Sequence, residues 1–379
     1  MPNSLEAAMP RILAQGLVAL RENTVMAKLV NTNFDVDARQ KGSSVDVPIP
    51  SAMGDAEDVV PSITQSAGYS ITPTYVPIKL DKWKKKDFTM SDKDIAEVME
   101  GYQNIQITEA ARSLANAVDR DLLRLYTKVA GFAGLAGQTG FQREDGVFGA
   151  HKGLNPARDA RKVLNRQLTP IGDRRIILDV DAEANATALP EFLSATDSGS
   201  TETIEEAVIG RKLGFDWYMT QNTLSHNTLA AGTIVTSGSA NLKDAKVLTV
   251  SGATVAPAEG DIFTIAGDFQ SYAVGKDATL TSWPITPPLK QPVAASTAVT
   301  VVADHVVSLA FHRDAFALAV RPLLDVDPVG NRIESFTDDE SGLTMRLEIS
   351  RENKQTRFSF DILYGCAAIR PECACRILG

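Results

Sequence analysis

Apolar and polar residues alternate most regularly near the C-terminus of the chain. The alternation runs from Leu343 to Ile349, breaks at a polar segment over 351–355, and resumes from Phe358 to Tyr364. A period of two places every second side chain on one face of a β-strand. The pattern predicts a long β-hairpin over about 343–364 with one buried face.

Apolar positions recur at helical spacing most clearly over 104–130, from Ile107 through Leu114 and Leu122 to Val129. Three- and four-residue steps place these side chains on one stripe, so the spacing predicts a long amphipathic helix. Shorter helices are predicted at about 10–21, from a cap at Asn155, and from a cap at Asp181 to about 193. Short strands are predicted at 175–178 and 215–219.

Prolines and small residues dominate residues 42–80, where helix is excluded. Val45–Val47 and Tyr75–Leu80 alternate like strands, and few large apolar residues lie between them. The segment is therefore predicted to be a long two-stranded loop rather than a domain.

Acidic and basic residues are segregated along this segment. Residues 42–78 hold only acids, namely Asp46, Asp55, Glu57 and Asp58, whereas residues 79–86 carry a net charge of +4 through Lys79, Lys82, Lys84, Lys85, Lys86 and Asp81.

Residues 225–303 are poor in charge and rich in short β-branched runs, with Gly, Pro, Asp and Ser between them. Such regularly spaced runs are typical of a small β-barrel or sandwich. The predicted strands lie at 233–236, 247–250, 262–265, 271–274, 279–282 and 297–302. The sequence thus predicts an all-β module inserted into a chain that otherwise mixes helices and strands.

Composition limits the classes of protein that remain. The 379 residues are 44% hydrophobic and 22% charged, as in packed globular proteins of two or three folding units. A net charge of -9 argues against phosphate binding by the whole chain. The three cysteines, Cys366, Cys373 and Cys375, lie at the C-terminal end and cannot form a disulfide framework for the body. No run has the length and apolarity of a transmembrane helix.

Catalytic motifs are absent from the sequence, so no enzyme activity and no cofactor is predicted. The four histidines are scattered and are interpreted as surface or packing residues. Asp179, Asp181 and Glu183 follow a predicted strand, where carboxylates could bind a divalent cation in a hydrolase. The alternative is a helix cap with acids in the first turn. The cysteines could similarly be metal ligands or buried free thiols.

The segment Lys82-Trp83-Lys84-Lys85-Lys86 leaves three interpretations open. It could bind nucleic acid through charge and aromatic stacking, form a solvated strand end, or make a salt-bridging contact between subunits. The other predicted parts include an N-terminal arm and long projections that cannot bury their own surfaces. Such projections favour a protein completed by neighbouring copies.

The order of these parts, together with four local strings, resembles the major capsid (coat) protein of tailed bacteriophages. The strings are KKKDFTMSDKDI at 84–95, GFDWYMTQN at 214–222, HRDAFALAVRP at 312–322 and YGCAAIRPECACRIL at 364–378. The resemblance implies an α+β fold of the Hong Kong ninety-seven type. It is nearest to coat proteins of short-tailed phages that carry an inserted β-barrel domain.

The resemblance also implies a division of the chain. The N-terminal arm would span 1–41 and the extended loop 42–82. The peripheral domain, with the spine helix at 104–130, would comprise 83–149 and 336–379. The axial domain would comprise 150–225 and 304–335, with the inserted β-barrel-like module at 226–303.

Family members assemble into an icosahedral shell of hexamers and pentamers. The resemblance therefore implies a homo-oligomer with a scaffolding protein and a portal protein as partners. Packaged double-stranded DNA would lie inside without sequence-specific contact, and no membrane is involved. The expected location is the virion capsid, after assembly in the cytoplasm of the host bacterium. A nanocompartment shell of the same fold is the first alternative, and the metal hydrolase is the second.

The charge segregation suggests how neighbouring subunits meet. We expect the acidic loop 42–78 of one subunit to lie over the basic segment 79–86 of the next, in a repeated head-to-tail contact. Asp46, Asp55, Glu57 and Asp58 would then face Lys82, Trp83, Lys84, Lys85 and Lys86 across the subunit interface. Each exposed pair contributes only about 0–1 kcal/mol, but a shell repeats the contact in every subunit.

Overall fold

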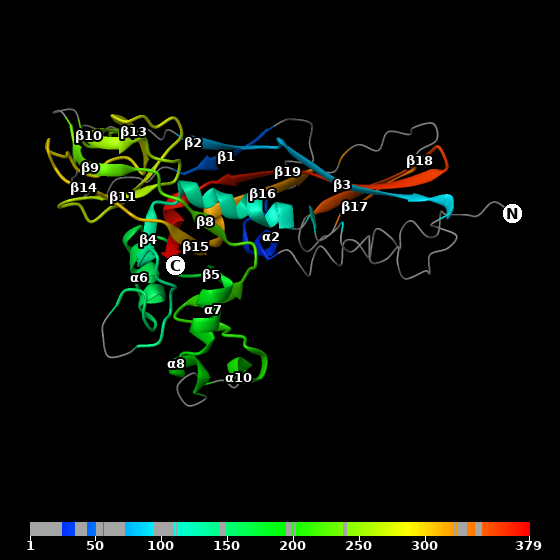
Figure 1. Ribbon diagram of the computed structural model, residues 1–379, viewed down its shortest axis with the longest axis horizontal. Coiled ribbons are helices and arrows are strands. Elements are labelled where there is room, and N and C mark those ends of the chain that lie inside the picture. The colour runs from blue at the N-terminus through cyan, green and yellow to red at the C-terminus, as the bar shows by residue number, and fades with distance from the viewer. Residues whose placement is uncertain are drawn as a thin grey trace, which may run out of the picture.

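The computed structural model describes residues 25–34, 44–50, 56, 73–93, 110, 113–114, 116–144, 149–194, 199, 202–237, 241–321, 323, 332–337 and 343–379. Figure 1 shows an elongated molecule: a long sheet lies along its main axis, a second sheet with its helices projects from this body, and a β module lies at one end. Separate hydrophobic clusters fill these three parts. Within the described ranges, no helix has both the length and the apolar character needed to cross a bilayer.

The long sheet is built around one strand of unusual length, β19 (Gln355–Ala368). One side of β19 pairs with β3 (Lys82–Ser91) along its N-terminal part. The other side pairs with β18 (Thr344–Glu352) and then with β16 (Phe316–Arg321). β17 (Arg332–Thr337), a strand that the sequence pattern did not indicate, continues the sheet beyond β18.

The predicted C-terminal hairpin is confirmed as β18 and β19. Its turn is Asn353–Lys354, where both residues have positive φ (48° and 61°), as a two-residue turn of type I′ requires. Leu343, Met345, Phe360 and Tyr364 are each 0% exposed. The alternating pattern therefore identified the buried face correctly.

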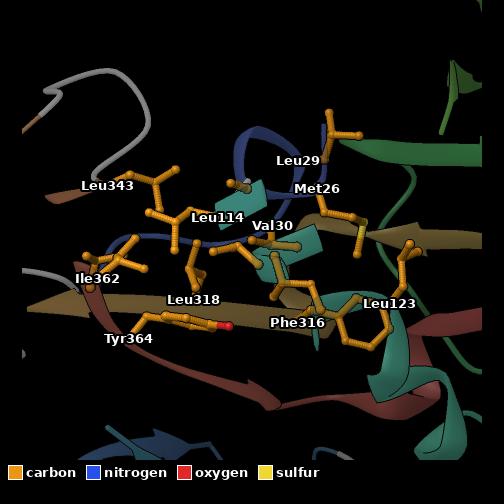
Figure 2. Packing of buried hydrophobic residues seen from close by; sticks show 14 of the residues in the cluster. Met26, Leu29, Val30, Leu114, Leu123, Phe316, Leu318, Leu343, Ile362 and Tyr364 are labelled. Atoms are coloured by element: carbon orange, nitrogen blue, oxygen red, sulfur yellow. The ribbon is translucent and has the colours of Figure 1, made fainter. Parts of the chain in front are cut away.

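The long amphipathic helix is confirmed wherever the structure describes it. Residues 110, 113–114 and 116–123 are helical, and residues 104–109 lie outside the described ranges. The predicted end at 130 is wrong, because the chain tightens into a 3-10 helix, η2 (Arg124–Lys128), and then enters β4. Figure 2 shows Leu114 and Leu123 of this helix packed with Phe316, Leu318 and Tyr364 of the sheet. Short α2 (Met26–Leu29) packs into the same cluster, whereas the helix predicted at 10–21 lies outside the described residues.

The two faces of β16 carry side chains of different size. Phe316, Leu318 and Val320 pack under the long helix, whereas Ala317 and Ala319 face an antiparallel ribbon of β1 (Ser44–Ile49) and β2 (Thr74–Lys79). Small side chains let the ribbon approach the sheet closely. The predicted pairing of two strands within the loop segment is thus confirmed.

The projecting sheet has the order β4-β20-β15-β5-β7-β6, and β8 pairs with β15 beside it. Its strands are β4 (Gly131–Gly134), β5 (Arg174–Leu178), β6 (Arg211–Lys212), β7 (Phe215–Met219), β8 (Leu224–His226), β15 (His305–His312) and β20 (Ala374–Leu378). Helix α6 (Asn155–Arg166) packs on β4 and β20. The short helices η3 (Arg313–Ala315) and η4 (Pro371–Cys373) contact one another near the start of β16.

Two of the predicted helix starts are corrected. Asn155 makes no capping bond, and its amide nitrogen instead donates to the Gly149 carbonyl (3.0 Å). The helix expected from a cap at Asp181 begins two residues earlier, because Asp179 is its cap and Val180 its first residue. It also divides into α7 (Val180–Thr187) and α8 (Pro190–Leu193), because the residue before a proline is disfavoured in helix. Helix α10 (Glu202–Glu206) follows.

The inserted module is a six-stranded sheet in the order β14-β11-β12-β13-β10-β9. Its strands are β9 (Ala231–Thr236), β10 (Val247–Val255), β11 (Ile262–Ile265), β12 (Ser271–Val274), β13 (Ser282–Thr286) and β14 (Val299–Val301). A bridge between Val235 and Ala298 joins the two ends into a closed barrel around Trp283. The strand predicted at 279–282 is displaced to β13, because Thr279 and Ser282 form a turn.

Candidate assembly interface

The lysine-rich run that the sequence indicated lies within β3. Its register on β19 sets Lys82 opposite Tyr364 and Lys84 opposite Ile362, both of which are buried under the long helix. Successive side chains of a strand point to opposite faces. Lys82 and Lys84 therefore lie on the helix side of the sheet, and Trp83 lies on the other side.

Both of these lysines end at one carboxylate on the helix, that of Asp121. The Nζ atoms of Lys84 and Lys82 lie 2.7 Å and 3.3 Å from Asp121 Oδ2. The Tyr364 hydroxyl donates to the same oxygen (2.7 Å), and Arg124 lies 3.4 Å from Oδ1. The Asp121 side chain is only 5% exposed, whereas the two lysines are about one-third exposed. Asp121 therefore fixes the strand to the helix within one subunit.

The charge state of Asp121 follows from these contacts. Burial alone would raise the pKa of this carboxyl, but hydrogen bonds from Lys84 and Tyr364 and the charge of Lys82 outweigh burial and lower it. Burial, together with the bond to Asp121, raises the pKa of Tyr364. Asp121 is thus an ionised acceptor and Tyr364 a neutral donor at neutral pH.

On the opposite face of β3, Trp83 joins a second ion pair. Its indole nitrogen donates to Asp361 Oδ2 (2.9 Å), and Arg346 donates to both oxygens of the same carboxylate (2.6 and 3.0 Å). The Trp83 side chain is nevertheless 64% exposed. The ring is therefore held in one orientation while most of its apolar surface faces solvent.

The remaining residues of the predicted contact differ in how the structure places them. Lys85 and Lys86 are exposed, and Lys85 lies 3.9 Å from Asp87. Asp46 is exposed on β1. Asp55, Glu57 and Asp58 lie outside the described residues. Lys82 and Lys84 are brought together by Asp121, whereas no described contact joins Asp46 to the lysine run.

An open groove of about 530 Å³ runs between the helix and the start of β3. Lys84, Arg120, Asp121 and Arg124 line it, together with Asn116. The lining includes three cations, Lys84, Arg120 and Arg124, and one acid, Asp121. The groove therefore has a net positive charge. It enlarges the basic surface that the sequence had located on β3 alone.

A second polar centre is buried where the β module joins the body. Asp261, 0% exposed in the module, lies 2.8 Å from the Nε2 atom of His226, and the Nδ1 atom of His226 lies 3.0 Å from the hydroxyl of Tyr126. Asp261 also accepts backbone N–H groups of Leu229, Ala230 and Ala258 (3.3, 3.2 and 3.0 Å). Asp261 is thus the acceptor of three backbone N–H groups and lies within hydrogen-bond distance of His226.

Arg376 completes this junction from β20. Its guanidinium is 0% exposed, donates to the Gly260 carbonyl (2.8 Å) and lies over the Tyr126 ring (4.9 Å). Burial lowers the pKa of Arg376 to about 9, which still leaves it charged at neutral pH. Burial and the nearby Arg376 charge lower the pKa of His305 to about 4, so that this ring is neutral. The module is therefore attached to the body by buried hydrogen bonds of His226 and Arg376 and by the contact of the Arg376 guanidinium with the Tyr126 ring.

Sequence reasoning did not find this junction. The sequence predicts surface or packing roles for His226 and His305; both are buried, and they pair across β8 and β15 with ring centroids 5.3 Å apart. One signal was available, because the two histidines bracket the charge-poor module. The contributions of Tyr126, Asp261 and Arg376 come from distant segments and have no signal in the sequence.

The acidic cluster proposed for a metal forms a helix start in the structure. Asp179 accepts the N–H groups of Asp181 (3.2 Å) and Ala182 (3.3 Å) and a bond from the Ser308 hydroxyl (2.9 Å). Asp181 and Glu183 occupy the first turn of α7, as the alternative interpretation expected. In the described segments, no group of three or more His, Cys, Asp or Glu is placed to hold a metal ion. The three cysteines are free thiols.

Asp119, on the long helix, is a buried carboxyl in contact with the N-terminal segment. Its carboxyl is 0% exposed and accepts the Val25 N–H (3.3 Å). Burial raises its pKa from 3.8 to about 7. Between these values the folded protein binds one proton more than the unfolded chain, so stability falls as pH rises through this window, by up to about 1.4 kcal/mol per pH unit.

We expect Asp119→Asn to remove that pH dependence, since an amide does not titrate. The measurement is the free energy of unfolding in urea for both proteins at several pH values between about 5 and 8. Equal pH dependence in the wild type and the variant would contradict the assignment of the proton to Asp119.

The sequence matches no family model and no curated protein, but the fold has relatives among solved structures. A chain of Mycobacterium phage Che8 has a TM-score of 0.52 at 17% identity, covering 94% of this chain and 91% of that one. A chain from the capsid structure of cyanophage P-SCSP1u has a TM-score of 0.52 at 14% identity, covering 94% and 88%.

At these identities the likeness establishes the fold. The chain has the Hong Kong ninety-seven-type capsid fold of tailed-phage major capsid proteins, which belongs to the α+β class. The fold predicted from the four strings and the order of parts is thereby confirmed.

Proposed function

We propose that this chain is the major capsid protein of a tailed bacteriophage. It assembles into the icosahedral shell that encloses the double-stranded DNA genome. The observation that carries this proposal is the fold match to the cyanophage capsid structure over 94% of the chain. The second sheet, with its helices, also projects from the body (Figure 1), and such a projection acquires a partner when copies assemble.

The division of the chain is part of the proposal. The sheet around β19, with the long helix, would form the peripheral domain (83–149 and 336–379). The projecting sheet would form the axial domain (150–225 and 304–335), and the barrel would be the inserted module (226–303). The ribbon β1–β2 would form the base of the extended loop (42–82), and residues 1–41 would form the N-terminal arm.

The contact between the acidic loop and the basic segment of the next subunit is also proposed. Lys85 and Lys86 are exposed and available to a neighbour, whereas Lys82 and Lys84 form ion pairs with Asp121 of the same subunit. The basic groove with Arg120 and Arg124 extends the surface that could receive Asp55, Glu57 and Asp58 of a second copy. The exposed Trp83 ring would add apolar area to that contact.

The remaining partners follow from the shell. A scaffolding protein would guide assembly in the host cytoplasm, a portal protein would occupy one vertex, and DNA would fill the particle without sequence-specific contact. The chain would act as a structural protein, with no catalytic role.

The content of the particles tests the DNA-enclosing role against a protein-filled nanocompartment. We expect particles from cells that express the chain with its genomic neighbours to protect double-stranded DNA from added nuclease. The measurement is the length of DNA recovered after nuclease treatment and disruption of the particles. Intact particles that contain protein cargo and no protected DNA would contradict the phage assignment and support the nanocompartment.

A further inference from the structure

The axial part of the chain carries two stretches of opposite charge. Residues 150–175 hold seven Lys or Arg and two Asp, whereas residues 176–210 hold eight Asp or Glu and no Lys, Arg or His. Neither the capsid fold nor the contact between loop and basic segment makes use of this separation. It therefore calls for an explanation of its own.

The basic surface lies on α6. Its buried side consists of Ala157, Ala160 and Leu164, while Arg158, Lys162 and Arg166 are exposed at successive four-residue steps, with Arg161 beside them. Residues four apart lie on one stripe of a helix. In the described part of the chain, Lys162 forms an ion pair with Asp159 at 3.9 Å, and Arg158 and Arg166 form none. The stripe is thus a continuous basic surface that faces solvent.

The acidic surface lies on the short helices α7, α8 and α10. Asp181, Glu191, Glu205 and Glu206 are all exposed, and none of them forms an ion pair with a described residue. Helices α8 and α10 contact one another, so that three of these acids lie on one unit. Like charges held together in this way favour a cationic partner.

The two surfaces occupy different places on one sheet. Helix α6 packs on β4 and β20 at one edge, whereas α10 leads directly into β6 at the other. Figure 1 shows α6 beside β4, and α8 and α10 at the far end of the projecting domain. One copy of the chain therefore presents both members of a complementary pair at separate positions.

Each surface also exposes apolar side chains. Leu168 (90% exposed) and Ile171 (68%) follow α6, and Ile204 (57%) and Val208 (46%) lie on and just after α10. Apolar side chains surrounded by charge are typical of surfaces that bind another protein. Burial of these residues against a partner would add to the electrostatic attraction.

We propose that the α6 surface of one copy binds the α8–α10 surface of a second copy in a head-to-tail contact. Such a contact uses two different patches of the same chain, so that repetition around an axis can close a ring. The opposite charges orient the approaching copies and disfavour the reversed pairings. The inference rests on the proposed function and adds to it a specific contact within a ring of subunits.

Charge reversal of each surface, alone and mixed, tests the pairing. One variant carries Arg158→Glu, Lys162→Glu and Arg166→Glu, and the other carries Glu191→Lys, Glu205→Lys and Glu206→Lys. We expect each alone to self-associate at least about tenfold more weakly than the wild type in sedimentation velocity. An equimolar mixture should recover association, because each variant then meets its opposite charge on both sides. Association of the wild type should also weaken as salt is raised.

The matched control is Lys243→Glu, Lys246→Glu and Lys276→Glu, which makes the same change in charge on the β module and should associate like the wild type. Thermal melting establishes that each variant is folded. A purified wild type that stays a single copy at every concentration would overturn this contact, whereas the proposed function fails only if co-expression with the genomic neighbours also yields no rings and no shells. A wild type that assembles, with α6 and α8–α10 variants indistinguishable from the control, would overturn this contact alone. Folded variants that each fail and do not recover on mixing would overturn the pairing as well.

Discussion

Replacement of Asp261 by alanine is expected to lower the free energy of unfolding by about 3–5 kcal/mol. The carboxylate is 0% exposed and is the acceptor for His226 and for three backbone N–H groups. Removing it leaves these donors buried without a partner and removes the negative charge that lies near the buried Arg376. Each loss is large because a buried donor left without an acceptor bears the cost of its desolvation.

The measurement is urea unfolding followed by tryptophan fluorescence, to which Trp283, 0% exposed in the module core, contributes with Trp83 and Trp217. Hydrogen exchange of module peptides is the second readout and is specific to the module. Asp304→Ala is the matched control. Asp304 also accepts a backbone N–H, that of Thr228 (2.7 Å), but it is exposed, and its removal should change the free energy by about 1 kcal/mol or less. Equal effects of the two substitutions would show that the buried network does not hold the module.

The second large effect is expected from Gly365→Ala, at the crossing of β19 and the ribbon. A Cβ atom at this position would lie 2.2 Å from the Lys79 carbonyl oxygen and 2.8 Å from its carbon. These are backbone atoms, so the ribbon itself must move away from the sheet. We expect a loss of stability of about 1–3 kcal/mol. The base of the extended loop would be displaced with the ribbon, and the yield of assembled particles should fall.

Gly172→Ala is the control for this substitution, because nothing lies within 4 Å of the position of its added Cβ. It should be neutral, or stabilise the protein by about 0.4–1 kcal/mol. Thermal unfolding and the fraction of protein in large particles are measured for both variants. If Gly365→Ala is as stable as Gly172→Ala and assembles normally, the ribbon does not lie as close to β19 as described.

Local sequence patterns were sufficient to predict a strand or helix wherever that element has one clearly buried face. The hairpin β18–β19 was predictable because Leu343, Met345 and Phe360 keep strict alternation and face one cluster. The barrel strands were predictable because apolar runs stand between turn residues, although β13 was displaced by the turn at Thr279. The long helix was predictable in type, but its end was not, since η2 has the same apolar spacing as the helix before it.

The strand β3 shows where pattern reasoning fails. Its lysines suggested a solvated or intersubunit segment, yet Lys82 and Lys84 lie against the helix, because their aliphatic stems cover apolar surface and their ammonium groups reach Asp121. That partner lies far away in the sequence. The junction of His226 with Asp261 could not be predicted for the same reason, because such contacts exist only once the chain has folded.

The junction also bears on the role of the module. Tyr126, His226, Asp261 and Arg376 join the end of the long helix, the projecting sheet, the barrel and the C-terminal strand at one buried point. These contacts come from four separate segments, so a rotation of the barrel on the body would break several buried hydrogen bonds at once. We therefore expect the barrel to keep a fixed orientation on the body in each subunit of an assembled shell.

Electron microscopy of the purified recombinant protein, alone and after co-expression with its genomic neighbours, tests the proposed function most directly. The proposal predicts closed icosahedral shells, or rings of subunits that precede them, in at least one of the two preparations. Folded single copies in both preparations, with no rings and no shells, would contradict the proposal that this chain is the coat protein of a phage.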